Sequence, residues 1–256
     1  MRQSMTGGNM NAVVRDGDTV RRISGPWTPS VHRYLRYLER AGIQWVPSPI
    51  GFDGELETLS FVEGTVPEYP LPDWVWTDSA LQQGARMLRR LHDASIGFGL
   101  DDALWQSPAK VPVEVICHND FAPHNLAFRD GTIVGAIDFD MCSPGPRIWD
   151  LAYFATRMVP LTGEPPPNAP VGSDAPRRIR SLLDAYGRDA GTVPLTPESL
   201  VRVAITRLHD LAEFSRVKAD ELRKPALLAD AEYYEHDAAH LGGMLEEGLF
   251  GEPSAS

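Results

Sequence analysis

The sequence predicts an α+β protein of two unequal lobes, with the smaller lobe first. Residues 1–62 of the 256-residue chain favour strands, with one helix among them. After a break at Glu63-Gly64 the pattern changes, because amphipathic helices dominate and the remaining strands are short. We therefore predict an N-terminal lobe of residues 1–62 and a larger, mainly helical lobe of residues 63–256.

The composition is that of an ordinary globular protein, with 43% hydrophobic and 23% charged residues. Because the formal net charge is −11, the chain is a poor general partner for nucleic acid, which requires a basic surface. No apolar run approaches the roughly 20 residues of a membrane helix, and residues 1–10 do not resemble a signal peptide. Two cysteines are too few for a disulfide framework. We expect a cytoplasmic protein that binds neither nucleic acid nor membrane.

The elements of the small lobe follow from local patterns. Residues 11–23 predict a β-hairpin whose turn is Asp16-Gly17. Residues 28–41 predict a helix, since Thr28 or Ser30 can cap it and apolar residues recur on one face. Residues 55–62 predict a hairpin or strand pair.

The larger lobe alternates helices with two short strands. Residues 78–94 predict an amphipathic helix, and residues 113–117 and 131–137 predict strands. Six prolines in residues 160–176 predict an irregular loop. Helices are expected near residues 177–187, 197–223 and 225–246, and a disordered tail over 251–256.

Polar residues with the spacing of a phosphoryl-transfer site lie in residues 115–140. Asp120 precedes Asn125 by five positions, and Asp138 follows after an intervening strand pair. A carboxylate such as Asp120 can orient an attacking hydroxyl and accept its proton. Asn125 and Asp138 offer the hard oxygen ligands that Mg²⁺ prefers, and the metal would neutralise phosphate charge.

His118 lies two residues before the predicted base and has two possible roles. We interpret it as a hydrogen-bond partner that orients the loop around Asp120. The alternative, in which His118 itself acts as the general base, stays open.

The motif HNDFAPHN at 118–125, followed by IDFD at 137–140, resembles the catalytic signature of the aminoglycoside phosphotransferase and choline kinase superfamily. Residues 146–155 and 87–95 are similar to further segments of that superfamily. The resemblance extends over about residues 6–245. It implies a protein-kinase-like two-lobed fold, Mg²⁺, ATP or GTP as the phosphate donor, and a small-molecule acceptor with a hydroxyl group.

The resemblance also implies a nucleotide site in the small lobe. The phosphates would lie under a loop at residues 6–14, where two glycines occur. The superfamily's strand lysine has no counterpart, but Val20 and Arg22 share a face as the Ala and Lys of V-A-I-K do. We predict that Arg22 holds phosphate, with Arg21 as the fallback and a surface arginine as the alternative.

Two further features of the nucleotide site follow from position alone. The superfamily pairs its lysine with a helix glutamate, whereas the corresponding residues here are near Val31 and His32, so we expect this ion pair to be absent. The adenine is expected against backbone groups of Ser60, Phe61 and Val62.

We expect the substrate to bind against the C-terminal helices, whose carboxylates could bind an amine. The candidates are Asp210, Glu213, Asp220, Glu221, Glu232, Glu235 and Asp237. Trp149, Tyr153 and Phe154 are interpreted as core rather than as a cage for a cation.

These observations lead to two hypotheses of different classes. The first is a Mg²⁺-dependent kinase that phosphorylates a hydroxyl of an aminoglycoside-like, amine-bearing or sugar-like molecule. The second is a pseudokinase-like binding or immunity module that sequesters a ligand, which the missing lysine and glutamate favour. The complete set of Asp120, Asn125 and Asp138 favours the first.

Overall fold

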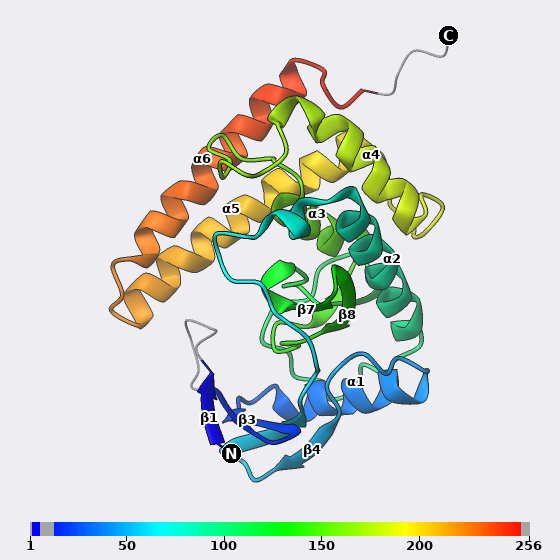
Figure 1. Ribbon diagram of the computed structural model, residues 1–256, viewed down its shortest axis with the longest axis vertical. Helices are drawn as coiled ribbons and strands as arrows, with labels where there is room; N and C mark the ends of the chain where they lie inside the picture. The colour runs from blue at the N-terminus through cyan, green and yellow to red at the C-terminus, as the bar shows by residue number, and fades with distance from the viewer. Residues whose placement is uncertain (1, 6–12, 252–256) are drawn as a thin grey trace. The chain divides into compact units, whose positions relative to one another are not determined.

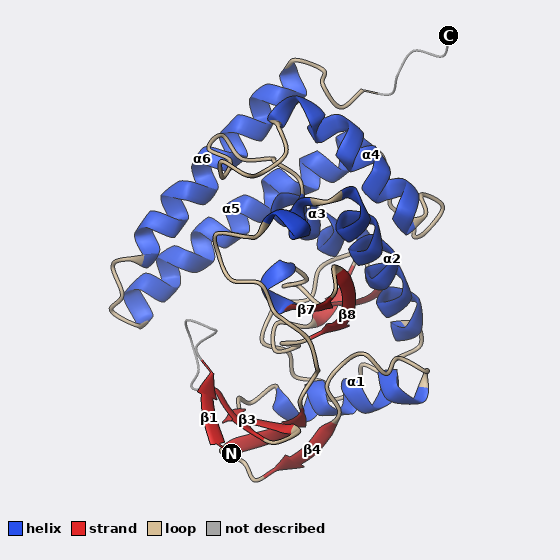
Figure 2. Cartoon of the chain, viewed as in Figure 1, coloured by secondary structure: helices blue, strands red, loops and turns tan. Residues whose placement is uncertain are grey.

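The computed structural model describes residues 2–5 and 13–251 (Figures 1 and 2). Contacts group the chain into two compact units, one of residues 1–67 and 89–146 and the other of residues 68–88 and 147–256. Most of the predicted phosphate loop, residues 6–12, and most of the predicted tail, residues 252–256, lie outside the described residues. The α+β class, with strands first and mainly helices afterwards, is confirmed. The functional boundary between residues 62 and 63 stays a prediction.

The first unit contains an antiparallel sheet in the order β1-β2-β3-β5-β4. Its strands are β1 (Arg2–Met5), β2 (Val13–Asp16), β3 (Thr19–Ile23), β4 (Pro49–Phe52) and β5 (Leu56–Ser60). The predicted hairpin is confirmed as β2–β3, and Gly17 in its turn has a φ of +63°. Residues 55–62 contain β5 alone, which pairs with β3 and β4. β4 was missed because Pro49 and Gly51 are poor strand residues that an edge strand tolerates.

Helix α1 (Thr28–Arg40) confirms the predicted helix but not its cap. The N-cap residue is Trp27, without a side-chain hydrogen bond. Thr28 Oγ1 accepts from the N–H of Gly25 at 2.9 Å, and Ser30 Oγ accepts from the N–H of Leu104 at 2.8 Å. Both hydroxyls therefore accept hydrogen bonds from neighbouring loops instead of capping the helix. The predicted apolar face is buried, with Val31, Tyr34, Leu35 and Leu38 at most 1% exposed.

The first unit also contains two strand pairs. β6 (Val115–Cys117) pairs with β9 (Ser143–Gly145), and β7 (Leu126–Arg129) pairs with β8 (Thr132–Ala136). The predicted strands at 113–117 and 131–137 correspond to β6 and β8 with shorter bounds. The loop with Asp120 follows β6, and the loop with Asp138 follows β8. Each of these two loops therefore follows a strand that is paired with a neighbour.

The segment after β5 runs against β7. Thr65 and Phe128 exchange two backbone hydrogen bonds of 2.7 and 2.9 Å. Gly64 has a φ of +152°, and a Cβ there would lie 2.9 Å from Ala127 Cβ. Only glycine fits this close approach without strain.

The second unit is helical. Its helices are the first part of α2 (Asp78–Ser95), α3 (Arg147–Met158), α4 (Ala175–Tyr186), α5 (Pro197–Glu221) and α6 (Leu227–Glu246), with 3₁₀ turns at Asp73–Trp76 and Gly172–Asp174. The predicted helices α2, α4, α5 and α6 are confirmed. Helix α3 was not among the predicted helices, and nearly all of its residues are buried, including the charged Arg147 and Asp150. Helices α5 and α6 lie side by side (Figure 1). None of the described helices is long and apolar enough to cross a membrane.

Candidate active site

Asp120 lies in the loop between β6 and the 3₁₀ turn Pro123–Asn125. Its Oδ2 accepts a 2.8 Å hydrogen bond from Asn125 Nδ2, and its Oδ1 is 3.3 Å from His124 Nε2. The Asp120 side chain is 28% exposed. The carboxylate is therefore held in one orientation while a solvent-borne molecule can still reach it.

Asn125 connects this loop to the loop that carries Asp138. Its Nδ2 donates to Asp120 at both the backbone oxygen, at 2.9 Å, and the carboxylate. This leaves Oδ1 as the amide atom that can accept or bind a cation. The backbone oxygen of Asn125 accepts from the N–H of Ile137 at 2.9 Å, which places the residue before Asp138 against Asn125. The two predicted metal ligands are brought together by this contact.

His118 is buried, and both its ring nitrogens meet backbone groups. Nε2 is 3.0 Å from the carbonyl oxygen of Ile137, and Nδ1 accepts from the N–H of Asp120 at 3.3 Å. A carbonyl only accepts, so Nε2 carries the hydrogen. These contacts favour the interpretation of His118 as a loop-orienting residue, and its role stays a prediction.

Arg22 lies at the centre of a cluster of carboxylates. It is 9% exposed, on the strand β3 between β2 and β5, so it is not a surface arginine, whereas Arg21 is exposed. Each guanidinium nitrogen meets a different acid: Nε donates to Glu57 at 2.7 Å, Nη1 to Asp138 at 2.9 Å and Nη2 to Asp140 at 2.5 Å. Arg22 thus contacts both carboxylates of the loop that follows β8.

Helix α1 supplies no glutamate at Val31 or His32, yet the further expectation, that the small lobe lacks a stabilising ion pair, is wrong. Arg22 has a buried carboxylate partner, but Glu57 comes from strand β5 and not from helix α1. His32 is on α1, at the position compared with the superfamily's glutamate, and its Nε2 is 2.7 Å from the other oxygen of Glu57. Sequence reasoning missed Glu57. Strand alternation gave a signal for this residue, because Glu57 shares the buried face of β5 with Leu59.

The three carboxylates around Arg22 have different electrostatic environments. Burial raises the pKa of Asp140 to about 6, although Arg22 opposes the shift. Burial also acts to raise the pKa of Glu57, but His32 and Arg22 together hold it below its ordinary value. Burial lowers the pKa of Arg22, yet the neighbouring carboxylates hold it above its usual range. Arg22 is therefore a permanent cation.

Each of the two loops that carry Asp120 and Asp138 contains a non-glycine residue with a positive φ. Asn119 and Asp138 have φ values of +63° and +62°, in the left-handed region that Asn and Asp tolerate best among residues with a side chain. Asn119 Nδ2 donates to the carbonyl oxygen of Met141 at 2.7 Å and to Ser143 Oγ at 2.8 Å. These bonds tie the loop of Asp120 to the chain that follows Asp138, which explains how the strained conformations persist.

The donor set of these loops fits a hard divalent cation. Asn125 Oδ1 and the carboxylate of Asp138 are oxygen ligands of the kind Mg²⁺ takes. The Asp138 side chain is 46% exposed, and Arg22 contacts its Oδ1. Asp140, which sequence reasoning passed over, is a second carboxylate two residues further on.

The residues predicted to face the adenine, Ser60, Phe61 and Val62, are partly engaged within the chain. The N–H of Ser60 donates to Ser48 at 2.9 Å, and the N–H of Phe61 donates to Asp18 at 2.8 Å. Val62 lies against Gly135, since a Cβ at Gly135 would be 2.3 Å from Val62 Cγ1. Val20 shares the inward side of β3 with Arg22 by strand alternation.

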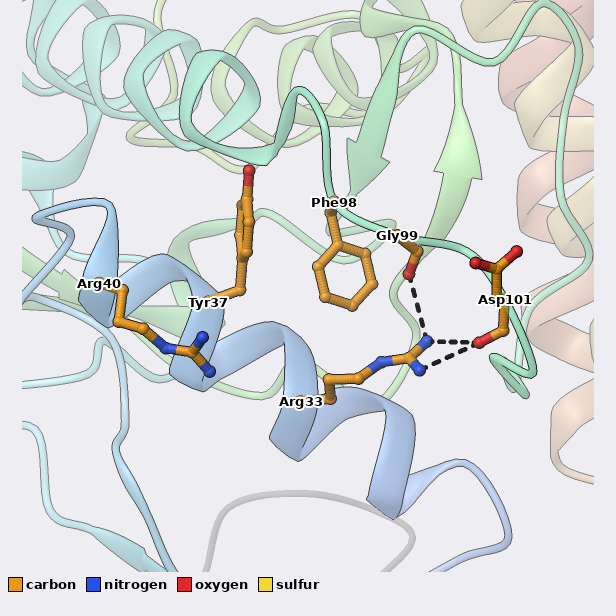
Figure 3. Close-up of a pocket in the computed structure, with 6 residues that line it drawn as sticks. All are labelled: Arg33, Tyr37, Arg40, Phe98, Gly99 and Asp101. Atoms are coloured by element: carbon orange, nitrogen blue, oxygen red, sulfur yellow. Dashed lines mark hydrogen bonds between the residues drawn. The ribbon is translucent and has the colours of Figure 1, made fainter.

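A small cavity of about 210 Å³ lies beside helix α1 (Figure 3). Its lining is Arg33, Tyr37, Arg40, Phe98, Gly99 and Asp101. Arg33 and Tyr37 hold the segment that follows α2 through bonds to its carbonyl oxygens. The lining therefore shares no residue with the predicted site.

In the second unit, most of the carboxylates predicted for the substrate have partners of their own. Glu235 pairs with His209 and Arg216 at 2.8 and 2.9 Å, and Asp237 accepts from Thr162 Oγ1 at 2.6 Å. Glu213 and Glu221 also pair with basic residues of helix α5. Glu235 and Asp237 thus join helix α6 to other segments, whereas Glu213 and Glu221 make exposed pairs within α5.

The aromatic residues of α3 are core, as predicted. Trp149, Tyr153 and Phe154 are at most 8% exposed. The guanidinium of Arg207 lies 4.9 Å from the ring centroid of Trp149 and 4.5 Å from that of Tyr153. The chain thus supplies its own cation to these rings.

Comparisons with known proteins agree with this architecture. A model of the phosphotransferase enzyme family matches residues 66–198, just over half of the chain. The chain is 34% identical over 226 residues to the trifolitoxin immunity protein of Rhizobium leguminosarum bv. trifolii, covering 84% of each protein.

Solved structures show the same fold at low sequence identity. A choline/ethanolamine kinase family protein from Mesorhizobium loti superposes with a TM-score of 0.69 at 14% identity, covering 98% of this chain and 90% of that one. The GDP complex of wild-type aminoglycoside 2'-phosphotransferase-IIIa superposes with a TM-score of 0.60 at 13% identity, covering 93% and 92%. With the family match and the 34% identical relative, the resemblance found in the sequence is confirmed: the chain belongs to the phosphotransferase enzyme family.

Proposed function

We propose that this protein transfers the γ-phosphate of ATP or GTP to a hydroxyl group of a small molecule, with Mg²⁺ as cofactor. The proposal rests chiefly on one contact, the hydrogen bond from Asn125 Nδ2 to the carboxylate of Asp120. It joins a candidate proton acceptor to a candidate metal ligand, and phosphoryl transfer needs both groups beside the reacting phosphate.

Asp120 is the proposed catalytic residue. It orients the acceptor hydroxyl, and Oδ1 or Oδ2 accepts its proton as the oxygen attacks phosphorus. His118 holds the N–H of Asp120 and the carbonyl oxygen of Ile137, and thereby keeps the two loops in register. Catalysis in this scheme is mainly positioning and charge stabilisation.

Asn125 and Asp138 are the proposed metal ligands. Bound Mg²⁺ would neutralise charge on the nucleotide phosphates. Arg22 adds a permanent positive charge at the same place, which a guanidinium can present to phosphate oxygens in a bidentate manner. Arg22 therefore takes the part that the resemblance assigns to a lysine.

The nucleotide base is proposed to lie against Val20 and the Ser60–Val62 segment. Because the N–H groups of Ser60 and Phe61 already donate within the chain, Val62 is the proposed backbone donor to the base. The phosphate loop expected at residues 6–14 belongs to the same proposal.

The acceptor is proposed to be a hydroxyl-bearing antimicrobial or toxin, or a related sugar-like or amine-bearing compound. The name of the relative, an immunity protein, supports a toxin. Asp237 is buried and accepts from Thr162, which argues against it as a ligand for an amine. By contrast, Glu213, Glu221 and Glu235 make exposed ion pairs that an amine could replace.

A second candidate function is an immunity module that binds a toxin without phosphorylating it, and the name of the relative favours it equally. The two functions differ in their need for nucleotide. A binder has no use for an acid, an amide and a metal-type carboxylate held together, so the arrangement of Asp120, Asn125 and Asp138 favours the kinase.

A thermal-shift titration with Mg·ATP and Mg·GTP tests the proposal. A ligand at 100 times its dissociation constant stabilises by about 2.7 kcal/mol, a rise in Tm of roughly 5–10 °C for a chain of this size. We expect a metal-dependent rise that Asp138→Ala abolishes, followed by labelling of an acceptor with γ-phosphate that Asp120→Asn abolishes. No shift with either nucleotide at millimolar concentration would refute the kinase and leave the binding module.

A further inference from the structure

We infer that Glu57, backed by His32, is a positioning residue that fixes the guanidinium of Arg22 for the nucleotide phosphates. This inference rests on the proposed function. It assigns to a strand carboxylate and a helix histidine the work that the resemblance expects of a single helix glutamate.

The first step of the argument is strand register. Arg22 of β3 and Glu57 of β5 are paired directly across the sheet, so their side chains leave the same face. Nε of Arg22 donates to Glu57 at 2.7 Å, and Glu57 is 1% exposed. A carboxylate that deep is costly unless its oxygens are satisfied. The contact is therefore a buried ion pair within the sheet and not an ion pair on the surface.

The second step is the other oxygen of Glu57. His32 Nε2 lies 2.7 Å from it and, because an ionised carboxylate only accepts, the histidine donates. With one donor on each oxygen, the carboxylate cannot rotate away from Arg22 without losing a charge-assisted bond. His32 acts on Arg22 only through Glu57.

The third step is the rigidity of helix α1, which carries His32. The far side of the helix is fastened to the segment after α2 (Figure 3). Tyr37 donates to the carbonyl oxygen of Ile96 at 2.9 Å, and Arg33 donates to that of Asp101 at 3.0 Å. His32 is thus on a helix that contacts both Glu57 of the sheet and the segment after α2.

The fourth step is that different nitrogens of the Arg22 guanidinium bind different carboxylates. Glu57 binds Nε, whereas Asp138 and Asp140 bind the terminal nitrogens Nη1 and Nη2. The terminal nitrogens can exchange carboxylates for phosphate oxygens while Nε stays anchored. A lysine has one nitrogen and cannot make this separation, which explains why arginine occupies the position.

The primary test observes Arg22 directly by NMR. The Nε–H resonance of Arg22 is assigned by its loss in Arg22→Lys, and its exchange with solvent is compared in wild type, Glu57→Gln and the matched control Glu55→Gln. Glu55 is exposed, two residues earlier in the chain. We expect exchange to accelerate at least about tenfold in Glu57→Gln only, the loss expected for one charge-assisted hydrogen bond. Unchanged exchange in Glu57→Gln overturns the inference.

A second measurement separates positioning from mere stability. The dissociation constant of Mg·ATP should rise about tenfold or more in Glu57→Gln, and Glu57→Gln/Arg22→Lys should bind no more weakly than Arg22→Lys alone. A structural role would lower Tm while leaving nucleotide affinity unchanged, and would contradict the inference. His32→Gln serves where Glu57→Gln does not fold, with a smaller change in the same direction expected. If wild type binds no nucleotide, the proposed function fails, and the Nε–H exchange still decides the position of Arg22.

Discussion

Asn125 donates its side-chain amide to the carboxylate of Asp120, 2.8 Å away and five residues earlier in the chain. The same amide also donates to the backbone oxygen of Asp120, so each residue fixes the other. A group that is to receive a proton and a group that is to bind a metal must both be in place before the substrate arrives. The pair meets that requirement within one short loop.

The first prediction concerns Asp120. Asp120→Asn should lower the rate of phosphotransfer by about 10²–10⁴-fold, the usual contribution of a general base, and should leave nucleotide affinity unchanged. Steady-state kinetics with a labelled nucleotide measures the rate, and calorimetry measures the affinity. Asp130→Asn, in the exposed turn between β7 and β8, is the control and should retain full activity. An activity of Asp120→Asn within a factor of three of wild type would remove Asp120 from the chemistry.

The second prediction concerns metal removal. Chelation of Mg²⁺ should abolish the nucleotide-dependent rise in Tm, because phosphate charge then faces Asp138 and Asp140 unscreened. Asp138→Asn should require a higher Mg²⁺ concentration for the same rise, since a neutral amide is a weaker ligand. Asp102→Asn is a matched control, because Asp102 is exposed and also has a positive φ, of 55°. Equal Mg²⁺ requirements for the two variants would exclude Asp138 as a ligand.

The sequence was sufficient to predict that strands come first and helices dominate later, although β4 and α3 were missed. Turn residues such as Asp16-Gly17 and the apolar face of α1 are local signals, and the spacing from Asp120 to Asn125 is a short-range one. The sequence did not indicate that the charged residues Arg147 and Asp150 of helix α3 are buried, because their burial depends on packing against distant parts of the chain.

The partner of Arg22 could not be predicted for a different reason. The comparison with the superfamily directed attention to the helix, whereas Glu57 meets Arg22 through the register of β3 and β5, 35 residues apart. Register is set by turns and packing across the whole sheet, so no local pattern encodes it. The same holds for Asp140, which reaches Arg22 over 118 residues.

The third prediction concerns packing in the second unit. A Cβ at Gly84 of α2 would lie 2.3 Å from Cζ of Phe154, a ring that is fully buried. Gly84→Ala should therefore lower the free energy of unfolding by about 1–3 kcal/mol. Gly243→Ala in α6 is the matched control, because a Cβ there would meet nothing within 4 Å and alanine favours a helix by about 0.5–1 kcal/mol. Chemical denaturation measures both, and shifts of the same sign would contradict the packing.

The fourth prediction concerns pH and Asp140, whose pKa burial raises from 3.8 to about 6. Between these values the folded state binds more protons than the unfolded state, so the contribution of Asp140 to stability falls as pH rises from about 4 to 6. The change is of the order of 3 kcal/mol. Asp140→Asn should remove this fall, and its stability relative to wild type should therefore increase across that range.

Glu57 provides the opposite case in the same cluster, because His32 and Arg22 hold its pKa below 4.5. Its contribution to stability is present above that pH and is lost as pH falls. Denaturant unfolding from about pH 3 to 7, with a chelator present, should accordingly give opposite slopes relative to wild type, for Glu57→Gln below about pH 4.5 and for Asp140→Asn between about pH 4 and 6. Parallel profiles for wild type and Asp140→Asn would mean that Arg22 offsets the burial of Asp140 completely.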